Sequence, residues 1–309
     1  MASALSKPES ILTHESDLDG LLSGLLMAKL AEKLFGEAPK VMAYQNLNWQ
    51  RRVMKEDCAW VTDFSFDKRV DKDSWLILDH HHYSHQPTVA TLVHDSSKSA
   101  SLLAYDLCRE HGIQSEKLDR LVHLSNVSDL FLEEDPEFEL ASDYANLVKA
   151  YGFWSIKALC ENDLESLLDH PLLKVMTMRR EIEDPIGLAW TRDHIEDICP
   201  GVGLAHTTVG NTNLIAHKLL TEENFAYNTL LILNRKFNGM ISVSLRSRNE
   251  EALSHAEKLQ GGGHPNACGA TLPKSIQSIP DAVAFLKKTL HPISAVAHES
   301  LDDALDAAF

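Results

Sequence analysis

Short apolar runs alternate with helical patterns through the first half of this chain of 309 residues. The runs read as β-strands and cover residues 10–13, 40–45, 58–62 and 75–78. Apolar residues recur at helical spacing over residues 19–35, 99–110 and 118–124, and Gly36 follows the first of these segments as a stop signal. Strands that alternate with helices predict an α/β fold built on a parallel sheet.

Three of these predicted strands are followed directly by residues that can bind a metal. His14 follows the first run, Asp63 follows the third, and Asp79-His80-His81 follows the fourth. In open parallel sheets, ligands bind beyond the carboxyl ends of the strands. We therefore expect these side chains to converge at one edge of the sheet.

The charge and the cysteines limit the class of protein. The formal net charge is −16, whereas a protein that tracks long nucleic acid usually presents a broad basic surface. This charge disfavours long nucleic acid as a partner, although a short phosphate ligand is compatible with it. The five cysteines are scattered, no apolar run reaches the roughly 20 residues of a membrane span, and the N-terminus lacks a secretory pattern. We expect a soluble cytoplasmic protein without a membrane partner.

The length favours two domains. Helical patterns dominate residues 140–180. The chain then becomes polar, and Pro185 and Pro200 mark breaks in the pattern. Two strand-like runs follow, at residues 230–233 and 240–245. We expect a catalytic domain over residues 1–185, a connecting helix or linker over 186–199, and a smaller α/β domain over 200–309.

Residues 14–20 read His-Glu-Ser-Asp-Leu-Asp-Gly, at a predicted turn from strand to helix. Asp17 and Asp19 diverge on extended backbone and can serve two adjacent ions, and Asp63 could bridge them. Carboxylate and imidazole ligands without a thiol favour Mn²⁺ or Mg²⁺ over Zn²⁺ and Co²⁺. Two ions about 3.5–4 Å apart can activate a water molecule and stabilise the leaving oxygen of a phosphoester.

Each of these residues also has a simpler interpretation when it is considered alone. Asp19 could be the N-cap of the following helix, and Asp63 could be a strand-end carboxylate without a function. Asp79-His80-His81 could be a polar loop. Their occurrence together, in order and at strand ends, favours the metal site.

A glycine cluster stands out in the second half. Gly261-Gly262-Gly263 precedes His264, and successive glycines allow backbone N–H groups to face an anion. A flexible turn is the alternative for the glycines alone. Arg246 and Arg248 lie two residues apart on a predicted strand, so we expect both to point to one face, where arginine can pair with phosphate.

The chain resembles the DHH phosphoesterase superfamily. The resemblance rests on the order His-x-x-Asp-x-Asp-Gly, Asp63, Asp79-His80-His81 and a later aspartate. The second half resembles the associated C-terminal substrate domain, through Leu245-Arg246-Ser247-Arg248, the Gly-Gly-Gly-His-Pro segment and Ala267-Cys268-Gly269-Ala270. Within the superfamily the chain is most similar to nanoRNase-type oligoribonucleases and small relatives of RecJ.

The resemblance implies a role for each matching residue. The first ion would be held by His14 and Asp17, with Asp63 as the bridge, and the second by Asp19, His80 and Asp129. The spacing of three from His14 to Asp17 is shorter than in many members with nanoRNase activity, and leaves open whether His14 or Glu15 contacts the first ion. The last ligand could also come from nearby acidic residues, namely Glu133, Glu134 and Asp135. These are interpreted instead as a solvent-exposed acidic face.

The resemblance also implies how substrate is bound. His81 would face the substrate phosphate, and Asp79 would orient the site without binding a metal itself. The active site would lie in an interdomain cleft, where the second domain binds the nucleotide end of the substrate with Arg246, Arg248, Gly262, Gly263 and His264.

The expected function is a phosphodiesterase with two Mn²⁺ ions (Mg²⁺ or Co²⁺ as substitutes) that hydrolyses short oligonucleotides or small nucleotide phosphoesters. The alternatives are an inorganic pyrophosphatase of the same superfamily and a nucleotide-binding regulatory module without activity. An exonuclease for long single strands fits the charge poorly. The oligomeric state stays open between a monomer and a homodimer.

Overall fold

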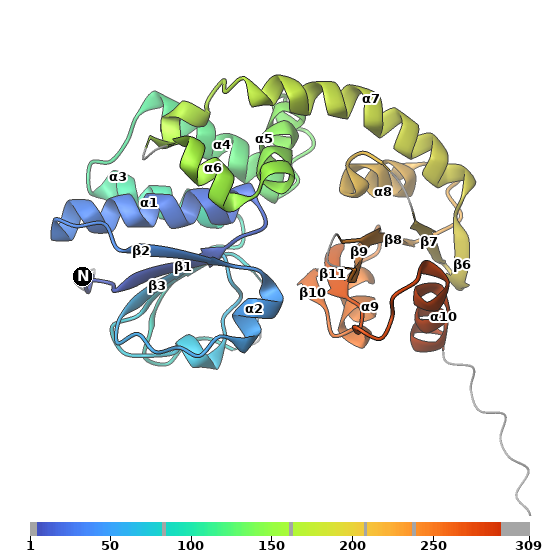
Figure 1. Cartoon of the computed structure of the whole chain (residues 1–309), viewed down its shortest axis with the longest axis horizontal. Helices are drawn as coiled ribbons and strands as arrows, with labels where there is room; N and C mark the ends of the chain where they lie inside the picture. The colour runs from blue at the N-terminus through green and yellow to red at the C-terminus, as the bar shows by residue number, and fades with distance from the viewer. Residues whose placement is uncertain (1–4, 82–84, 161–162, 207–208, 237–238, 292–309) are drawn as a thin grey trace, which may run out of the picture. The chain divides into compact units, whose positions relative to one another are not determined.

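The computed structural model describes residues 5–81, 85–160, 163–206, 209–236 and 239–291. The chain divides into two compact units, Met1–Met178 and Arg179–Phe309. Each unit, as far as the structure describes it, contains one β-sheet with helices packed on it (Figure 1). Within the described residues, no helix combines the length and the apolar character that crossing a bilayer requires.

The first unit is built on a parallel sheet, as the sequence predicts. In the part of the unit that the structure describes, five strands are ordered β2-β1-β3-β4-β5, and every pairing is parallel. The strands are β1 (Ser10–His14), β2 (Lys40–Tyr44), β3 (Ala59–Thr62), β4 (Leu76–Asp79) and β5 (Thr91–His94). The strand order reverses at β1 and β3, so the carboxyl ends of these two strands flank a topological switch point, where ligands bind in such sheets.

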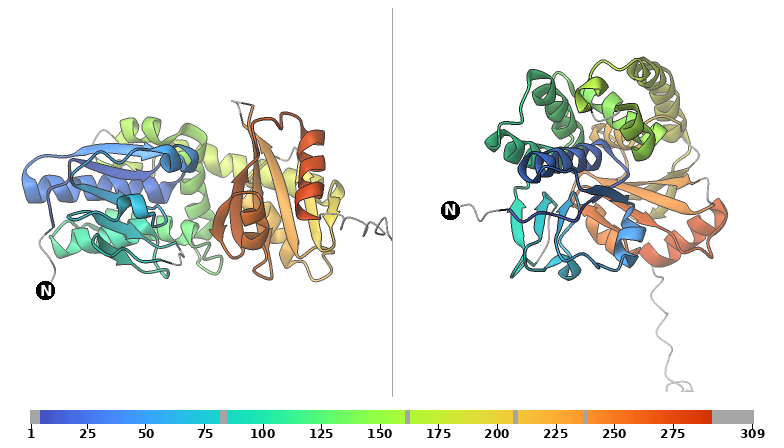
Figure 2. Two further views of the ribbon diagram at one scale, coloured as in Figure 1. Left: turned by 90° about the horizontal axis from the view of Figure 1, so that it is seen from below. Right: turned by 60° about the vertical axis from the view of Figure 1, so that its left-hand side comes forward.

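The helices of the first unit are α1 (Leu18–Phe35), α2 (Asn46–Arg51), α3 (Ala100–Glu110), α4 (Glu116–Asp129), α5 (Phe138–Tyr151) and α6 (Phe153–Cys160), and short 3₁₀ turns lie at Lys68–Val70 and Leu164–Leu167. Helix α1 runs along the sheet and packs against α3 and α4 (Figure 1 and Figure 2). A cluster that includes Trp49, Phe64 and Trp75 packs with Leu12 and Ile77 of the strands. The sequence patterns did not predict α2 or β5.

Helix α1 begins next to the predicted metal ligands. Asp17 is its N-cap, and the Asp17 carboxylate accepts a hydrogen bond from the backbone N–H of Gly20 at 2.9 Å. The predicted stop at Gly36 is confirmed, since this residue takes the left-handed conformation with φ 82°. The cap of this helix is therefore Asp17, and the alternative in which Asp19 caps it is wrong.

The second unit contains a mixed sheet. Its strands are β6 (Glu196–Cys199), β7 (Val202–His206), β8 (Thr229–Arg235), β9 (Ile241–Ser247), β10 (Gly262–His264) and β11 (Ala267–Thr271), and in the described residues they are ordered β10-β11-β9-β8-β7-β6. Apolar side chains of α9 (Ala252–Lys258) and α10 (Ile279–Leu290) pack on one face, and those of α8 (Thr212–Thr221) pack on the other (Figure 1). The predicted α/β character of both halves is confirmed.

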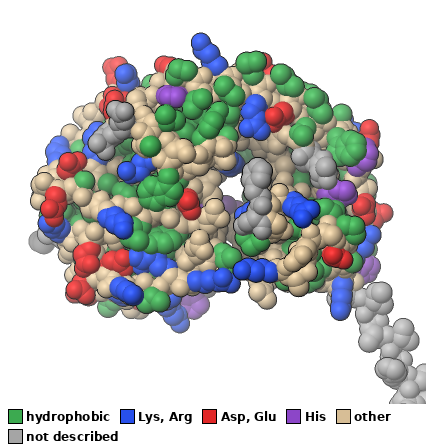
Figure 3. All heavy atoms as spheres, viewed as in Figure 1, with side chains coloured by type: hydrophobic (Ala, Val, Ile, Leu, Met, Phe, Trp, Pro, Cys, Tyr) green, Lys and Arg blue, Asp and Glu red, His purple; other side chains and the backbone are tan. Residues whose placement is uncertain are grey.

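Helix α7 (Leu172–Asp193) runs across the point where the two units divide. The segment expected as a linker, residues 186–199, contains the end of α7 and the whole of β6, which pairs antiparallel with β7. The predicted domain limits stay a prediction. Figure 3 shows hydrophobic side chains among charged ones along the top of the view, where α7 runs in Figure 1. The exposed apolar residues of α7 include Val175, Met178, Ile182 and Ile186.

Candidate active site

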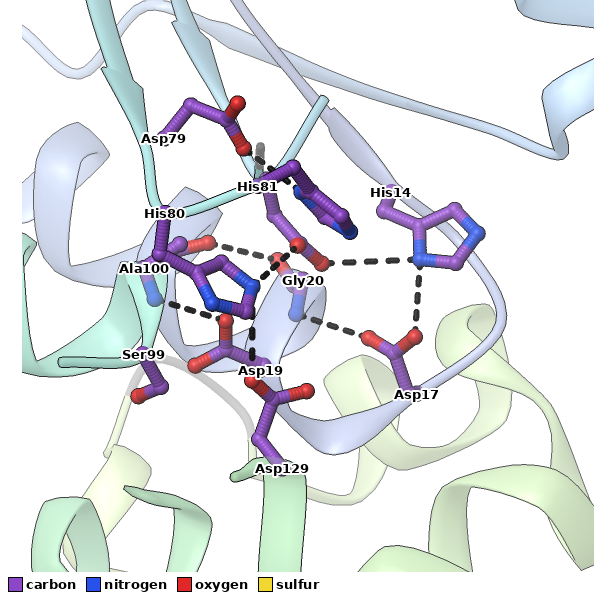
Figure 4. Close-up of polar contacts among 12 residues, drawn as sticks. His14, Asp17, Asp19, Gly20, Asp79, His80, His81, Ser99, Ala100 and Asp129 are labelled. Atoms are coloured by element: carbon purple, nitrogen blue, oxygen red, sulfur yellow. Dashed lines mark hydrogen bonds and ion pairs between the residues drawn. The ribbon is translucent and has the colours of Figure 1, made fainter. Parts of the chain in front are cut away.

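The carboxyl edge of the parallel sheet brings the predicted ligands into two adjacent groups (Figure 4). His14, Asp17 and Asp63 form the first group, and their candidate ligand atoms lie within 4.8 Å of one another. Nδ1 of His14 lies 2.8 Å from Oδ2 of Asp17 and 3.4 Å from Oδ2 of Asp63. Glu15, the rival of His14, is in none of the candidate metal-binding groups found among the described residues.

Asp19, His80 and Asp129 form the second group, again with ligand atoms within 4.8 Å. Nε2 of His80 lies 3.3 Å from Oδ2 of Asp129, which is the last residue of α4. The rival residues Glu133 and Glu134 are exposed. The structure therefore brings Asp129 to the position that the resemblance assigns to the last ligand.

Asp63 lies between the two groups. Its Oδ2 faces His14, and its Oδ1 lies 3.7 Å from Nε2 of His80. The residue has φ 58°, in the left-handed region that aspartate and asparagine tolerate better than most residues, and its backbone N–H donates to the carbonyl of Leu78. The turn at the end of β3 thus directs one buried carboxylate toward both groups, as a bridging ligand requires.

Asp79 and His81 form a pair beside these groups. Nδ1 of His81 lies 2.7 Å from Oδ1 of Asp79, which is completely buried. Burial opposes ionisation of Asp79, but the hydrogen bond from His81 outweighs it and lowers the Asp79 pKa. Burial likewise lowers the pKa of His81, and Asp79 raises it above the ordinary value. The buried carboxylate therefore orients the His81 ring and favours its charged form.

The buried carboxylates fit bound cations. Burial is the main cause that raises the pKa of Asp19 to about 6, and repulsion from the Asp63 carboxylate is the second cause. Burial and the charges of Asp19 and Asp63 raise the pKa of Asp129 well above its usual range. Oδ2 of Asp63 and Oδ2 of Asp129 are buried and accept no hydrogen bond from any described residue, although each lies near a histidine nitrogen. Divalent cations would neutralise this concentration of negative charge.

Asp19 is held by groups that the sequence did not point to. Its Oδ2 accepts from the backbone N–H of Ala100 and its Oδ1 from that of Ser101, both at 2.8 Å, and Ser125 Oγ lies 3.4 Å from Oδ1. The two N–H groups belong to the first turn of α3, where backbone donors have no partner within the helix. Asp19 thus caps a helix far away in the sequence.

A different set of candidates lies on the sheet of the second unit. Arg246 of β9 is directly opposite Ala267 of β11, which is opposite His264 of β10. Residues opposite each other on adjacent antiparallel strands share a face, so Arg246 and His264 flank a small residue on one side of this sheet. Among the described residues, Arg246 has no carboxylate partner, and burial lowers its pKa to about 10. An anionic ligand would supply the missing charge.

Arg248 lies in a different environment from Arg246. It follows the end of β9, and its guanidinium donates to Oδ1 of Asn228 and to the carbonyl of Phe225, both at 3.0 Å. These bonds fasten the loop that precedes β8. The structure gives Arg248 a role in holding its own unit, and its predicted contact with substrate stays a prediction.

The three glycines also differ. A Cβ on Gly261 would clash with the carbonyl oxygen of Gly269, and a Cβ on Gly263 would clash with that of Ala267. A Cβ on Gly262 would meet no atom within 4 Å. Close packing on β11 therefore explains Gly261 and Gly263, whereas the absence of a side chain at Gly262 leaves open space over the sheet.

Comparison with known proteins finds a family match in the second unit. The family model of the DHHA1 domain matches residues 205–291. This segment follows an N-terminal sheet whose strand ends carry the Asp-His-His motif and its expected partners in order. The second unit therefore contains a DHHA1 domain.

Two solved structures, RecJ and an exopolyphosphatase-related protein, share the fold of this chain. RecJ from Thermus thermophilus, in complex with Mn²⁺, has a TM-score of 0.53 at 17% identity, over 93% of this chain and 52% of RecJ. This chain thus spans about half the length of RecJ. An exopolyphosphatase-related protein from Bacteroides fragilis has a TM-score of 0.51 at 16% identity, over 91% of both chains. The pGpG-specific phosphodiesterase PggH from Vibrio cholerae has a TM-score of 0.49 at 14% identity, over 91% of this chain and 98% of that one. No curated protein sequence matches the chain.

Proposed function

We propose that the protein is a metal-dependent phosphodiesterase that hydrolyses short oligonucleotides or small nucleotide phosphoesters. It would use two divalent ions, with Mn²⁺ preferred. The observation that carries the proposal is the meeting of two candidate ligand groups at Asp63. His14 and Asp17 would hold one ion, and Asp63 would be shared. The other ion would be held by Asp19, His80 and Asp129.

When bound, two such ions lower the pKa of a water molecule and offset the charge that develops on a reacting phosphate. The protein's own contribution beside them is His81. Because Asp79 engages Nδ1 of His81, Nε2 is the nitrogen that would donate to a phosphate oxygen. Asp79 raises the pKa of His81 and so favours the charged form of this donor.

The second unit supports a nucleotide substrate. Arg246, His264 and the open position at Gly262 share one face of a sheet, and a guanidinium without a carboxylate partner suits a phosphate. The net charge of −16 disfavours long strands, whose binding needs many basic contacts. We therefore favour substrates of a few nucleotides.

The test is a panel of substrates with and without Mn²⁺. It contains a dinucleotide, an oligonucleotide of about 20 residues, 3′-phosphoadenosine 5′-phosphate and pyrophosphate. We expect Mn²⁺-dependent turnover of the small nucleotides, faster than that of the long strand, and at least about 100-fold slower turnover with Asp63→Asn. Turnover of pyrophosphate alone would instead favour a pyrophosphatase. Mn²⁺ binding without hydrolysis would favour a regulatory module and overturn the proposal.

A further inference from the structure

The face of the second sheet that carries Arg246 has a strip of small residues, which we call the shelf: Ser244, Gly262, Ala267 and Gly269. Ser244 is opposite Gly269, and Gly269 is opposite Gly262. These three residues lie two positions along their strands from Arg246, Ala267 and His264, so both rows share one face of the sheet. On the same face, Leu230 and Ile232 of β8 pack against α8. Helix α8 therefore borders the shelf.

The first turn of α8 places one polar side chain beside the shelf. Oδ1 of Asn213 accepts a hydrogen bond from Ser244 Oγ at 3.1 Å. Asn211 caps the helix, because its Oδ1 accepts from the backbone N–H groups of Asn213 and Leu214. These backbone donors are therefore already used. In the described part of the chain, Nδ2 of the half-buried Asn213 makes no hydrogen bond, so it is the donor that this helix end offers to a ligand.

The position suits the base of a nucleotide whose phosphate binds Arg246. Ser244 and Arg246 lie two residues apart on β9, about 7 Å along the strand, which is comparable to the separation of phosphate and base within one nucleotide. The shelf between them has no large side chain that would block a planar ring. A base on the shelf would therefore reach Asn213 with one edge.

The hydrogen-bonding capacity of Asn213 then decides which base fits. Asparagine reads adenine with its oxygen and nitrogen together, but here the bond from Ser244 holds Oδ1 and fixes the orientation of the amide, so that Nδ2 is the group without a partner among the described residues. The Nδ2 donors match the keto oxygen at position 6 of guanine or position 4 of uracil, where adenine and cytosine carry an amino group. Resting on the proposed function, we propose that Asn213, held by Ser244, selects nucleotides whose base carries a keto oxygen at this position, which are the guanine and uracil nucleotides.

The test measures binding of 5′-GMP, 5′-UMP, 5′-AMP and 5′-CMP to the metal-free full-length protein by calorimetry. We expect the two keto nucleotides to bind about tenfold more tightly than the two amino nucleotides. Asn213→Asp presents acceptors in the same volume and should reverse the preference. Ser244→Ala frees the amide to turn and should reduce the preference to about twofold. Asn249→Asp, the same change at an exposed residue of this unit, should leave the preference unchanged.

Equal affinity for all four nucleotides, or no binding of any, would overturn the inference. So would an Asn213→Asp protein that binds all four more weakly in unchanged ratios, since Asn213 would then only support the fold. The proposed function fails separately, through the hydrolysis panel. A protein without turnover that prefers GMP refutes only the hydrolysis, and an active phosphodiesterase without base preference refutes only the role of Asn213.

Discussion

Nε2 of His80 lies 3.3 Å from Oδ2 of Asp129, although one residue follows a strand of the sheet and the other ends helix α4. The same nitrogen is 3.7 Å from Oδ1 of Asp63. Burial lowers the pKa of His80, but the surrounding carboxylates raise it to about 9. Without ions, the protonated imidazole thus provides part of the positive charge that this group of carboxylates requires.

The first prediction concerns Asp63, which lies between the two ligand groups. Asp63→Asn should reduce Mn²⁺-dependent hydrolysis by at least about 100-fold, because even outer partners of metal ligands cost 10–100-fold. Asparagine tolerates the left-handed backbone at φ 58°, so the melting temperature should change little. Asp63→Ala should lose activity and also about 1–2 kcal/mol of stability. Full activity of Asp63→Asn would contradict the bridging role.

The two adjacent histidines should be separable by experiment. His81→Ala should lower turnover by about 100-fold or more and leave Mn²⁺ affinity almost unchanged, since His81 is assigned to the substrate phosphate. His80→Ala should weaken Mn²⁺ binding itself. Calorimetry with Mn²⁺ and steady-state kinetics on a dinucleotide distinguish the two effects. Equal loss of Mn²⁺ affinity in both variants would show that His81 is a ligand.

The two arginines of the second unit should also differ. Arg246→Ala should raise the KM for a dinucleotide about tenfold or more and leave the melting temperature nearly unchanged, because its guanidinium has no carboxylate partner in the described chain. Arg248→Ala removes two bonds to the loop before β8 and should lower the melting temperature. A higher KM for Arg248→Ala together with a lower melting temperature for Arg246→Ala would show that the two roles are the other way round.

The glycine cluster offers a matched series. Gly261→Ala and Gly263→Ala should destabilise the protein, because each new methyl group clashes with a carbonyl oxygen of β11. Gly262→Ala has open space and should fold normally, but the methyl group would stand where a ligand approaches. Thermal unfolding and nucleotide binding, measured on all three, test this. Normal nucleotide affinity of Gly262→Ala would argue against a contact there.

A pH-dependent contribution to stability comes from Asp71. Its carboxylate accepts hydrogen bonds from the backbone N–H groups of Thr88, Val89 and Ala90, just before β5, and these bonds lower its pKa. A lowered folded-state pKa gives stability that is present above the unfolded value of about 3.9 and is lost as the pH falls further.

Asp71→Asn should therefore melt at a lower temperature than the parent protein near pH 6, and the difference should shrink below about pH 4. Asp73→Asn, a change at an exposed carboxylate nearby, is the control and should have little effect. A difference between Asp71→Asn and the parent that does not vary with pH would show that the charge is not responsible.

The strand-end residues of the site could be predicted from the sequence for a physical reason. His14, Asp63 and Asp79 each follow or end a buried apolar run, and parallel strands align their carboxyl ends at one edge. Asp129 ends a helix, so no strand pattern marks it, and only the resemblance pointed to it. The assignment of these residues as metal ligands stays a prediction.

Other features depend on contacts that leave no pattern in the sequence. Asp19 is held by backbone N–H groups of Ala100 and Ser101, and a backbone donor is the same whatever the residue. Strand β5 is short and partly exposed at the edge of its sheet, so it lacks the apolar run of its neighbours. The spacing of Arg246 and Arg248 suggested a shared role, but β9 ends at Ser247, between them.

The bond from Asp19 to the first turn of α3 has a consequence for how the protein folds. The second ligand group takes its side chains from α1, α4 and the end of β4, and α3 fixes the orientation of one of them. A partly folded chain would contain the same residues without their arrangement. Tight Mn²⁺ binding should therefore be acquired only in the last cooperative step of refolding, and would report that the first unit is complete.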